Sequence, residues 1–150
     1  MIKVLFLCHG NICRSPMAQF VFQKMVDEAG LSEHFVIESK ALSKEGIGNP
    51  IHYGTKDIFR RYNIAYTEHY ASEFKSTDYE YYDYILLMDQ NNISRMKRYI
   101  DEDKDAKIEL LLENASIADP WFSGNFEKTY EDVLLGSKEL LKRIRNDYNI

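Results

Sequence analysis

The stretch of residues 2–16 restricts the fold more than any other part of the chain, because it reads as a strand, a short loop and a helix start in succession. Residues 2–7 are almost continuously apolar, as in a parallel-sheet strand that is covered on both faces. Ser15 is a residue type that caps helices, and Pro16 fits the first helical turn, where its missing N–H costs nothing. The stretch therefore predicts the first strand and helix of an α/β protein.

The loop between these two elements has the pattern of an anion site. A loop of about six residues over a helix N-terminus points backbone N–H groups inward, and the helix dipole adds to their attraction for an anion. Arg14, at the far end of the loop, carries a planar guanidinium that matches two oxygens of a phosphate. Cys8, at the near end, is expected below the bound anion, in surroundings that favour a thiolate. The spacing predicts a cysteine nucleophile aimed at phosphorus.

Strand-like and helix-like segments alternate along the rest of the chain. Apolar periodicity predicts helices over 16–29, 50–62, 90–99 and 126–148, and strands over 35–39, 84–88 and 107–111. Gly30 and Asn63 are expected to end the first two helices, while Asn49 and Asp89 are expected to cap the second and third. The less regular segments are expected to form a loop with a short helix over 64–82 and an irregular loop over 113–125.

This alternation predicts one α/β domain over residues 1–150. Its expected core is a four-stranded parallel sheet, doubly wound and Rossmann-like, with helices on both faces. Ligands of such sheets bind beyond the carboxyl ends of the strands. Because Cys8, Asp89 and Asp119 follow the first, third and fourth expected strands, we expect them at one rim of the sheet.

Composition limits the class of protein and its partners. A net charge of −5 argues against a nucleic-acid surface and a polybasic membrane patch, and no apolar run is long enough to span a membrane. Only two cysteines occur, Cys8 and Cys13, which argues against a disulfide framework and predicts a cytoplasmic location. A lipid-attachment signal is disfavoured because Leu7 stands where a small residue is needed. A zinc site at Cys8, His9 and Cys13 is disfavoured because a second pair of ligands is lacking.

The segment CHGNICRSPMA, with Asp119-Pro120 far downstream, closely resembles the low molecular weight protein tyrosine phosphatase family over essentially the whole chain. The resemblance implies hydrolysis of phosphotyrosine in a protein substrate through a cysteinyl-phosphate, without metal or organic cofactor. It implies that Cys8 is the nucleophile, that Arg14 binds the phosphate, and that Asp119 is the general acid and then the general base. Protonation by an acid is needed because a phenolate is a poor leaving group near neutral pH. The sequence leaves the oligomeric state open, and we expect a monomer.

The resemblance also implies roles for residues around the loop. The phosphate is expected to lie among residues of the loop itself, namely His9, Gly10, Asn11, Ile12, Cys13 and Ser15. The loop is expected to be braced by side-chain hydrogen bonds of Asn11, Ser15, Ser39 and His69, although His69 is equally well explained as an ordinary packing histidine. Asn11 is also a residue type that tolerates left-handed backbone geometry.

Residues beside the loop bear on redox chemistry and specificity. Cys13 is expected either to form a protective disulfide with Cys8 or to be a small buried thiol without a redox role. Trp121 and Phe122, where the family often has paired tyrosines, offer flat apolar walls to a phenyl ring. Glu45 stands where the family often has a bulky aromatic residue, and it is expected to disfavour acidic peptides or favour basic ones.

Three other functions remain as alternatives. A protein arginine phosphatase of the same fold typically has a small polar residue where Ile12 stands, so Ile12 favours phosphotyrosine. An arsenate reductase of this fold needs cysteines beyond Cys8 and Cys13. A non-catalytic phosphate-binding module would not need both a nucleophile and an acid, and the chain has Cys8 and Asp119.

Overall fold

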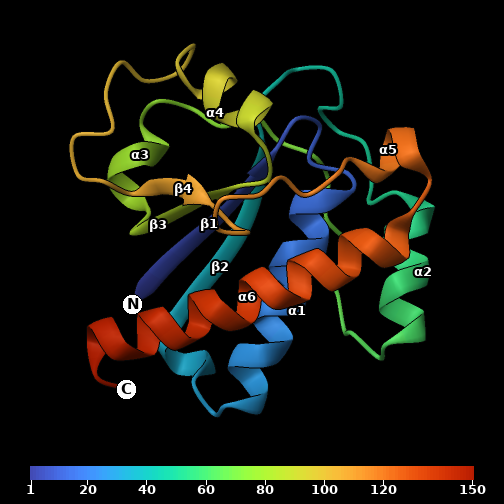
Figure 1. Ribbon diagram of the computed structural model, residues 1–150, viewed down its shortest axis with the longest axis horizontal. Coiled ribbons are helices and arrows are strands. Elements are labelled where there is room, and N and C mark those ends of the chain that lie inside the picture. Colours follow the sequence, from blue (N-terminus) through green and yellow to red (C-terminus); the bar gives the residue numbers. More distant parts are fainter.

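The computed structural model describes residues 1–150. Its strands are β1 (Ile2–Cys8), β2 (Phe35–Ala41), β3 (Tyr84–Leu87) and β4 (Ile108–Leu110). These strands lie in the order β2-β1-β3-β4, and every neighbouring pair is parallel (Figure 1). The predicted four-stranded parallel sheet is therefore confirmed, with β2 two residues longer and β3 and β4 shorter than expected.

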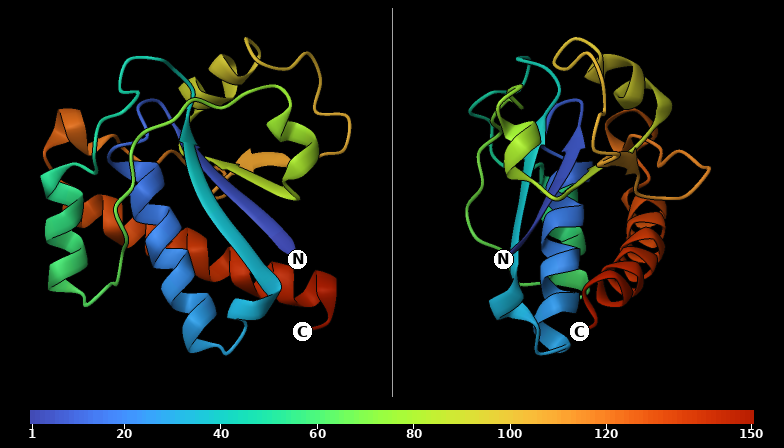
Figure 2. Two further views of the ribbon diagram at one scale, coloured as in Figure 1. Left: turned by 180° about the vertical axis from the view of Figure 1, so that it is seen from behind. Right: turned by 90° about the vertical axis from the view of Figure 1, so that its left-hand side faces the viewer.

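Helices cover both faces of this sheet, as predicted. The helices are α1 (Arg14–Glu28), α2 (Tyr53–Arg61), α3 (Asp78–Tyr81), α4 (Gln90–Met96), α5 (Pro120–Ser123) and α6 (Phe126–Tyr148), and a short 3₁₀ helix spans Ser32–His34. Helices α1 and α6 pack together against one face, and α2 lies beside them (Figures 1 and 2). The other face is covered by α3, α4 and the adjoining loops.

Strand β1 contributes to the core on both sides, because alternate side chains of a strand point to opposite faces. Val4 and Phe6 belong to the core beneath α1 and α6, and Leu5 and Leu7 belong to the core beneath α3 and α4; all four are fully buried. The Phe6 ring meets the ring of Phe22 edge to face at 5.6 Å, a contact worth about 0.5–1.5 kcal/mol beyond burial. A strand held on both faces gives the residue at its end, Cys8, a fixed position.

The direction of winding reverses beside β1. From β1 the chain goes to β2 on one side, and it later enters β3 on the other side. A crevice forms where the winding of a parallel sheet reverses, beyond the carboxyl ends of the two strands. Cys8 is the last residue of β1, and Asp89 caps α4 directly after β3. The topology thus places the cysteine loop at the usual ligand crevice of this sheet.

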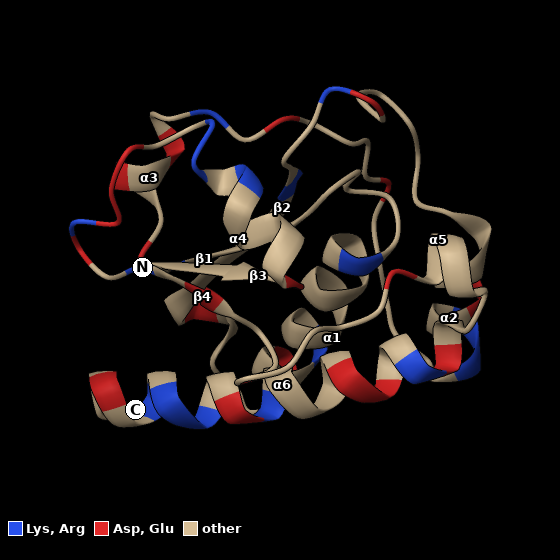
Figure 3. Cartoon of the chain, turned by 45° about the horizontal axis from the view of Figure 1, so that its top comes forward, with Lys and Arg blue, Asp and Glu red and all other residues tan.

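Apart from Arg14 and Asp132, the charged side chains are at least partly exposed at the surface of the molecule. Figure 3 shows Lys and Arg interspersed with Asp and Glu along α6, whereas β3 has no charged residue. None of the helices combines the length and apolar character required to cross a bilayer.

The start of α1 differs from the prediction. The helix begins at Arg14, and Cys13 precedes it without a side-chain cap, so Ser15 is not the capping residue. The Ser15 hydroxyl instead hydrogen-bonds Asn11 and Cys8 in the loop. The other end is as expected: Gly30 has a φ of 72°, and Leu31 N donates to Val26 O at 3.0 Å, as in a glycine-terminated helix.

The predicted start of α2 is wrong because a distant segment competes for it. Backbone hydrogen bonds join Gly48 N to Ala71 O and Ala71 N to Asn49 O, so residues 48–50 lie beside 70–71 instead of entering a helix. The cap is His52, whose Nδ1 accepts from Gly54 N at 3.0 Å. Asn63 has a φ of 54° just beyond the end of α2, as predicted.

Two later helix predictions also need correction. Helix α4 ends at Met96, because the following residues tighten into turns in which Arg98 N donates to Arg95 O. The segment 113–125 is not wholly irregular, since Asp119, Pro120 and the left-handed Gly124 supply the cap, first turn and end of α5. The short helix expected within 64–82 is α3, and α6 has the predicted bounds.

Candidate active site

The thiol of Cys8 lies at the floor of the loop that joins β1 to α1. Its Sγ is 3.3 Å from Asn11 N, 3.4 Å from Ser15 N and 3.1 Å from the Ser15 hydroxyl oxygen. The residue is buried, so little water competes with these contacts. Donors arranged in this way stabilise negative charge on the sulfur.

The rest of the loop contains backbone N–H groups that have no hydrogen-bond acceptor within the protein. The amides of residues 9, 10 and 12–14 donate no hydrogen bond within the chain. They lie at the N-terminus of α1, a 15-residue helix whose dipole places positive potential there. Such an array binds an oxyanion, because each oxygen accepts hydrogen bonds from amides that are already in place.

The guanidinium of Arg14 is held by the two segments that follow β3 and β4. Its side chain is only 3% exposed, and Nη1 donates to Asp89 Oδ2 at 2.6 Å and to the carbonyl oxygen of Ile117 at 2.9 Å. Nη2 lies 3.4 Å from Asp119 Oδ2. Burial by itself lowers the pKa of Arg14, but the charges of Cys8, Asp89 and Asp119 raise it above the usual value. The site therefore contains a permanent, oriented cation.

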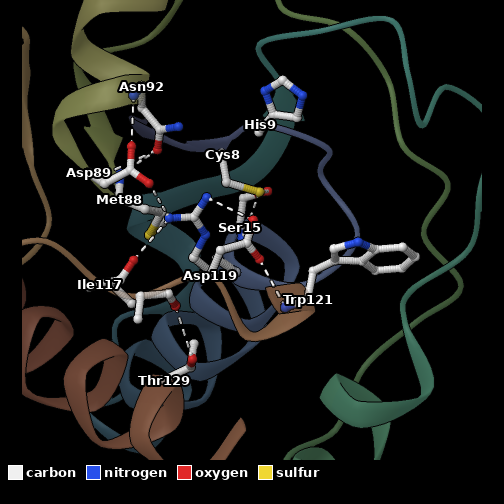
Figure 4. A network of polar contacts seen from close by, with 12 residues as sticks. Cys8, His9, Ser15, Met88, Asp89, Asn92, Ile117, Asp119, Trp121 and Thr129 are labelled. Atoms are coloured by element: carbon white, nitrogen blue, oxygen red, sulfur yellow. Dashed lines mark hydrogen bonds and ion pairs between the residues drawn. The ribbon is translucent and has the colours of Figure 1, made fainter. Parts of the chain in front are cut away.

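The carboxylate of Asp119 is oriented by its own backbone surroundings. Oδ1 accepts from Trp121 N at 3.1 Å as the cap of α5 (Figure 4). Oδ2 is then directed toward Arg14. The preceding carbonyl, of Ala118, accepts from the Thr129 hydroxyl on α6 at 3.2 Å. Oδ1 is thus fixed by the cap, while Oδ2 has only the long 3.4 Å contact with Arg14 and belongs to a residue that lines the pocket.

A buried network braces the loop from behind. Asn11 has a φ of 57°, and its Nδ2 donates to Ser15 Oγ at 2.7 Å and to Ser39 Oγ at 3.0 Å. Its Oδ1 lies 2.9 Å from His69 Nε2 and accepts from Ser72 N at 3.3 Å. Burial lowers the pKa of His69, so the neutral imidazole is favoured near neutral pH. The structure thus brings together the four residues that were expected to support the loop.

Cys13 is the residue that directly precedes α1. It is buried, and its carbonyl oxygen accepts from the Thr55 hydroxyl at 3.0 Å. Burial, followed by the charges of Cys8 and Asp119, raises the pKa of the Cys13 thiol to about 12. Cys13 is therefore a neutral thiol at neutral pH, and both cysteines are free.

A cavity of about 280 Å³ opens over the sulfur of Cys8. Its lining includes the loop residues Cys8, His9, Gly10, Ile12, Cys13 and Arg14, the segment residues Glu45, Gly46 and Asn49, and Asp119, Trp121 and Phe122. The Trp121 and Phe122 side chains remain mostly exposed at the mouth, and Figure 4 shows the Trp121 indole extending away from the polar network. No group of three His, Cys, Asp or Glu side chains is arranged to hold a metal ion.

The family model described as low molecular weight phosphotyrosine protein phosphatase matches residues 3–149. The chain belongs to this phosphatase family. The low molecular weight protein-tyrosine-phosphatase YfkJ of Bacillus subtilis is 35% identical over 98% of both chains, and its crystal structure superimposes with a TM-score of 0.93 over 98% of this chain and 96% of that one. The low molecular weight phosphotyrosine protein phosphatase of mouse is 36% identical over 94% of each chain. A low molecular weight protein tyrosine phosphatase from Streptococcus pyogenes is 41% identical, with a TM-score of 0.88 over 95% of this chain and 93% of that one.

Within this phosphatase site, sequence reasoning missed the partner of Arg14. Asp89 was expected only as a helix cap at the same rim, yet it also forms the 2.6 Å ion pair with Arg14. Its capping box with Asn92 is visible in the sequence, but the pairing with a residue 75 positions away is not. Sequence reasoning also missed the contact between His9 and Glu45, whose Nε2 and Oε2 atoms are 2.7 Å apart.

Proposed function

We propose that the pocket over Cys8 hydrolyses phosphotyrosine in protein substrates, with residues 1–150 acting as one catalytic domain. The observation that carries the proposal is the position of the Cys8 sulfur below unpaired backbone amides, with Arg14 and Asp119 beside the same pocket. A nucleophile, an oxyanion site and an acid are the groups that a two-step phosphate transfer requires.

In the first step the Cys8 sulfur attacks phosphorus, the S–P bond forms and the P–O bond to the tyrosine breaks. The free amides of the loop and the Arg14 guanidinium stabilise the charge on the phosphate oxygens. Asp119, in its protonated form, gives its proton to the departing phenolate oxygen. General acid catalysis of this kind contributes about 10²- to 10⁴-fold.

In the second step water attacks the cysteinyl-phosphate and the S–P bond breaks. Asp119, now a carboxylate, takes the proton of the attacking water, so the acid of the first step serves as the base of the second. The thiolate leaves with the hydrogen bonds of Asn11 N and the Ser15 hydroxyl already in place, 3.3 and 3.1 Å from the sulfur. Inorganic phosphate is released, and the enzyme returns to its starting state.

The mouth of the pocket favours an aryl phosphate. Trp121 and Phe122 line it with exposed aromatic surface, which suits the faces of a phenyl ring. Ile12 adds an apolar side chain to the lining where a phosphoarginine enzyme of this fold would have a small polar residue.

The test is hydrolysis of matched phosphotyrosine and phosphoarginine peptides, with a metal chelator present, by the wild type and by Cys8→Ser and Asp119→Ala. The proposal predicts a preference for phosphotyrosine, no turnover by Cys8→Ser, and a rate about 10²- to 10⁴-fold lower for Asp119→Ala. A preference for phosphoarginine would show that Ile12 does not set specificity. Tight phosphopeptide binding without turnover by the wild type would mean a binding module.

Assembly and location follow as further proposals. All three catalytic side chains, Cys8, Arg14 and Asp119, come from one chain, so a monomer is sufficient for activity. Light scattering during gel filtration tests this by giving either the 17.7 kDa mass of one chain or a multiple of it. The cytoplasmic location remains a prediction from the cysteine content.

A further inference from the structure

The mouth of the pocket is chemically asymmetric. Trp121 and Phe122, 59% and 84% exposed, form an apolar side. The lining also includes Glu45, whose side chain is 73% exposed, and His9, whose side chain is 38% exposed. A phenyl ring that enters between these groups brings the neighbouring residues of its peptide past a carboxylate.

The position of Glu45 is fixed by contacts with the catalytic loop. Leu42 N donates to Cys8 O at 2.9 Å, and the Ser43 hydroxyl donates to His9 O at 2.8 Å. One residue after Glu45, Gly46 lies so close to the loop that an added Cβ would come within 2.9 Å of Gly10 O. The segment is thus held against the loop on both sides of Glu45.

Glu45 offers negative charge to solvent at this fixed place. Its Oε2 contacts His9 Nε2 at 2.7 Å, and Oε1 has no partner within the chain. The hydrogen bond and charge of His9 lower the pKa of Glu45, so the carboxylate is ionised near neutral pH. Arg95 also acts on this carboxylate, but its Nε is committed to the carbonyl oxygen of Leu42. Neither Arg95 nor the neighbouring Lys44 lines the pocket.

We propose that Glu45 is a specificity-determining residue that selects phosphotyrosine flanked by basic side chains. The proposal rests on the function proposed above and names the substrate class of the same site. Glu45 Oε1 pairs with a lysine or arginine beside the phosphotyrosine, while His9 holds Oε2 in place. An acidic residue in the same position meets a like charge.

The experiment compares two phosphotyrosine peptides that differ only in the residues on either side of the phosphotyrosine, lysine in one and glutamate in the other. The measured quantity is the ratio of their kcat/KM values for each enzyme, which cancels any general loss of activity. We expect the wild type to prefer the lysine peptide by about 3- to 10-fold at low salt, the range for exposed charges that attract in one case and repel in the other. The preference should shrink at high salt, because exposed charges are screened.

Glu45→Gln keeps a hydrogen-bonding side chain beside His9 but removes the charge, so its ratio should fall below about 2, and Glu45→Lys should reverse the preference. Glu33→Gln, in the 3₁₀ helix before β2, changes the net charge equally at the opposite end of the sheet and should keep the wild-type ratio. Equal turnover of the two peptides by the wild type, or an unchanged ratio in Glu45→Gln, would overturn the inference. No turnover of either peptide by the wild type would instead overturn the proposed function.

Discussion

Replacing Asp89 by Asn tests whether the Arg14 cation is positioned by its ion pair. In the structure Asp89 Oδ2 accepts from Arg14 at 2.6 Å, and Oδ1 accepts from Asn92 N at 2.8 Å as the cap of α4. Asn is as good a cap as Asp, so Asp89→Asn keeps the cap while removing the charge that faces Arg14. The variant therefore isolates the ion pair.

The expected loss of stability follows from the burial of the two partners. The side chains are 3% and 18% exposed, so the pair is largely but not wholly desolvated. Breaking a fully buried pair costs about 3–5 kcal/mol, and losing a hydrogen bond to a charged group costs about 1.5–3 kcal/mol. Asp89 keeps some contact with water, and Arg14 retains its hydrogen bond to the Ile117 carbonyl oxygen. We therefore expect Asp89→Asn to lower the free energy of unfolding by about 1.5–3 kcal/mol. For a chain of this size that corresponds to a fall in Tm of about 3–12 °C.

The activity of Asp89→Asn should fall even at temperatures where the variant remains folded. A guanidinium that is no longer held can move by about 1 Å, and misplacement on that scale costs up to about 10²-fold in rate. Thermal unfolding measures the loss of stability, and kcat/KM for an aryl phosphate measures the loss of rate. The inhibition constant of inorganic phosphate measures how well the displaced guanidinium still binds phosphate. Asp89→Ala, which also loses the cap, should be less stable than Asp89→Asn by about 0.5–2 kcal/mol. A Tm within 1 °C of wild type together with unchanged phosphate inhibition would refute the reasoning.

Three further predictions concern the loop and its surroundings. Gly46→Ala should weaken phosphate inhibition and lower stability by about 1–3 kcal/mol, because its Cβ would approach Gly10 O to 2.9 Å; unchanged values for both would contradict the close packing. Burial lowers the pKa of His69 in the folded protein, so at mildly acidic pH the unfolded state binds a proton that the folded state does not. The stability that depends on the neutral imidazole is therefore present at neutral pH and is lost as the pH falls below about 6.5. Chemical denaturation at several pH values should accordingly show the difference between wild type and His69→Gln shrinking from pH 7 to pH 5, and a constant difference would contradict the assignment. Peroxide should oxidise Cys8 to the sulfenic acid, and a redox role of Cys13 predicts that its sulfur then attacks the Cys8 sulfur, water leaves, and a disulfide forms that mass spectrometry detects and reductant reverses. Because the raised pKa of Cys13 leaves little thiolate at neutral pH, this disulfide should form faster as the pH rises. Irreversible oxidation of Cys8 at the same rate in wild type and Cys13→Ser would show that Cys13 is only a packed thiol.

The features that the sequence predicted correctly depend on local signals. The buried run of β1, the left-handed Asn11 and the glycine that ends α1 each follow from a few neighbouring residues. The shared rim of Cys8 and Asp119 follows instead from the predicted direction of the strands, because parallel strands end at one edge of a sheet.

The features that the sequence did not predict depend on contacts between distant segments. Asn49 and Pro50 have the local pattern of a helix start, but hydrogen bonds with Ala71 hold them in an extended segment. Arg14 and Asp89 are 75 positions apart, and their ion pair has no signature in the sequence around either residue. No local pattern shows these partners, since they are brought together only when the sheet has formed.

The proposed mechanism depends on a cysteinyl-phosphate intermediate, and trapping this intermediate tests the mechanism directly. Asp119→Ala should be mixed rapidly with an aryl phosphate whose leaving group needs no protonation, then quenched in acid and digested for mass spectrometry. Without its base for the second step, the enzyme should accumulate up to one phosphate per chain, on the peptide that contains Cys8, and Cys8→Ser should carry none. Turnover without phosphate on Cys8, or a Cys8→Ser variant that retains activity, would contradict the cysteinyl-phosphate mechanism.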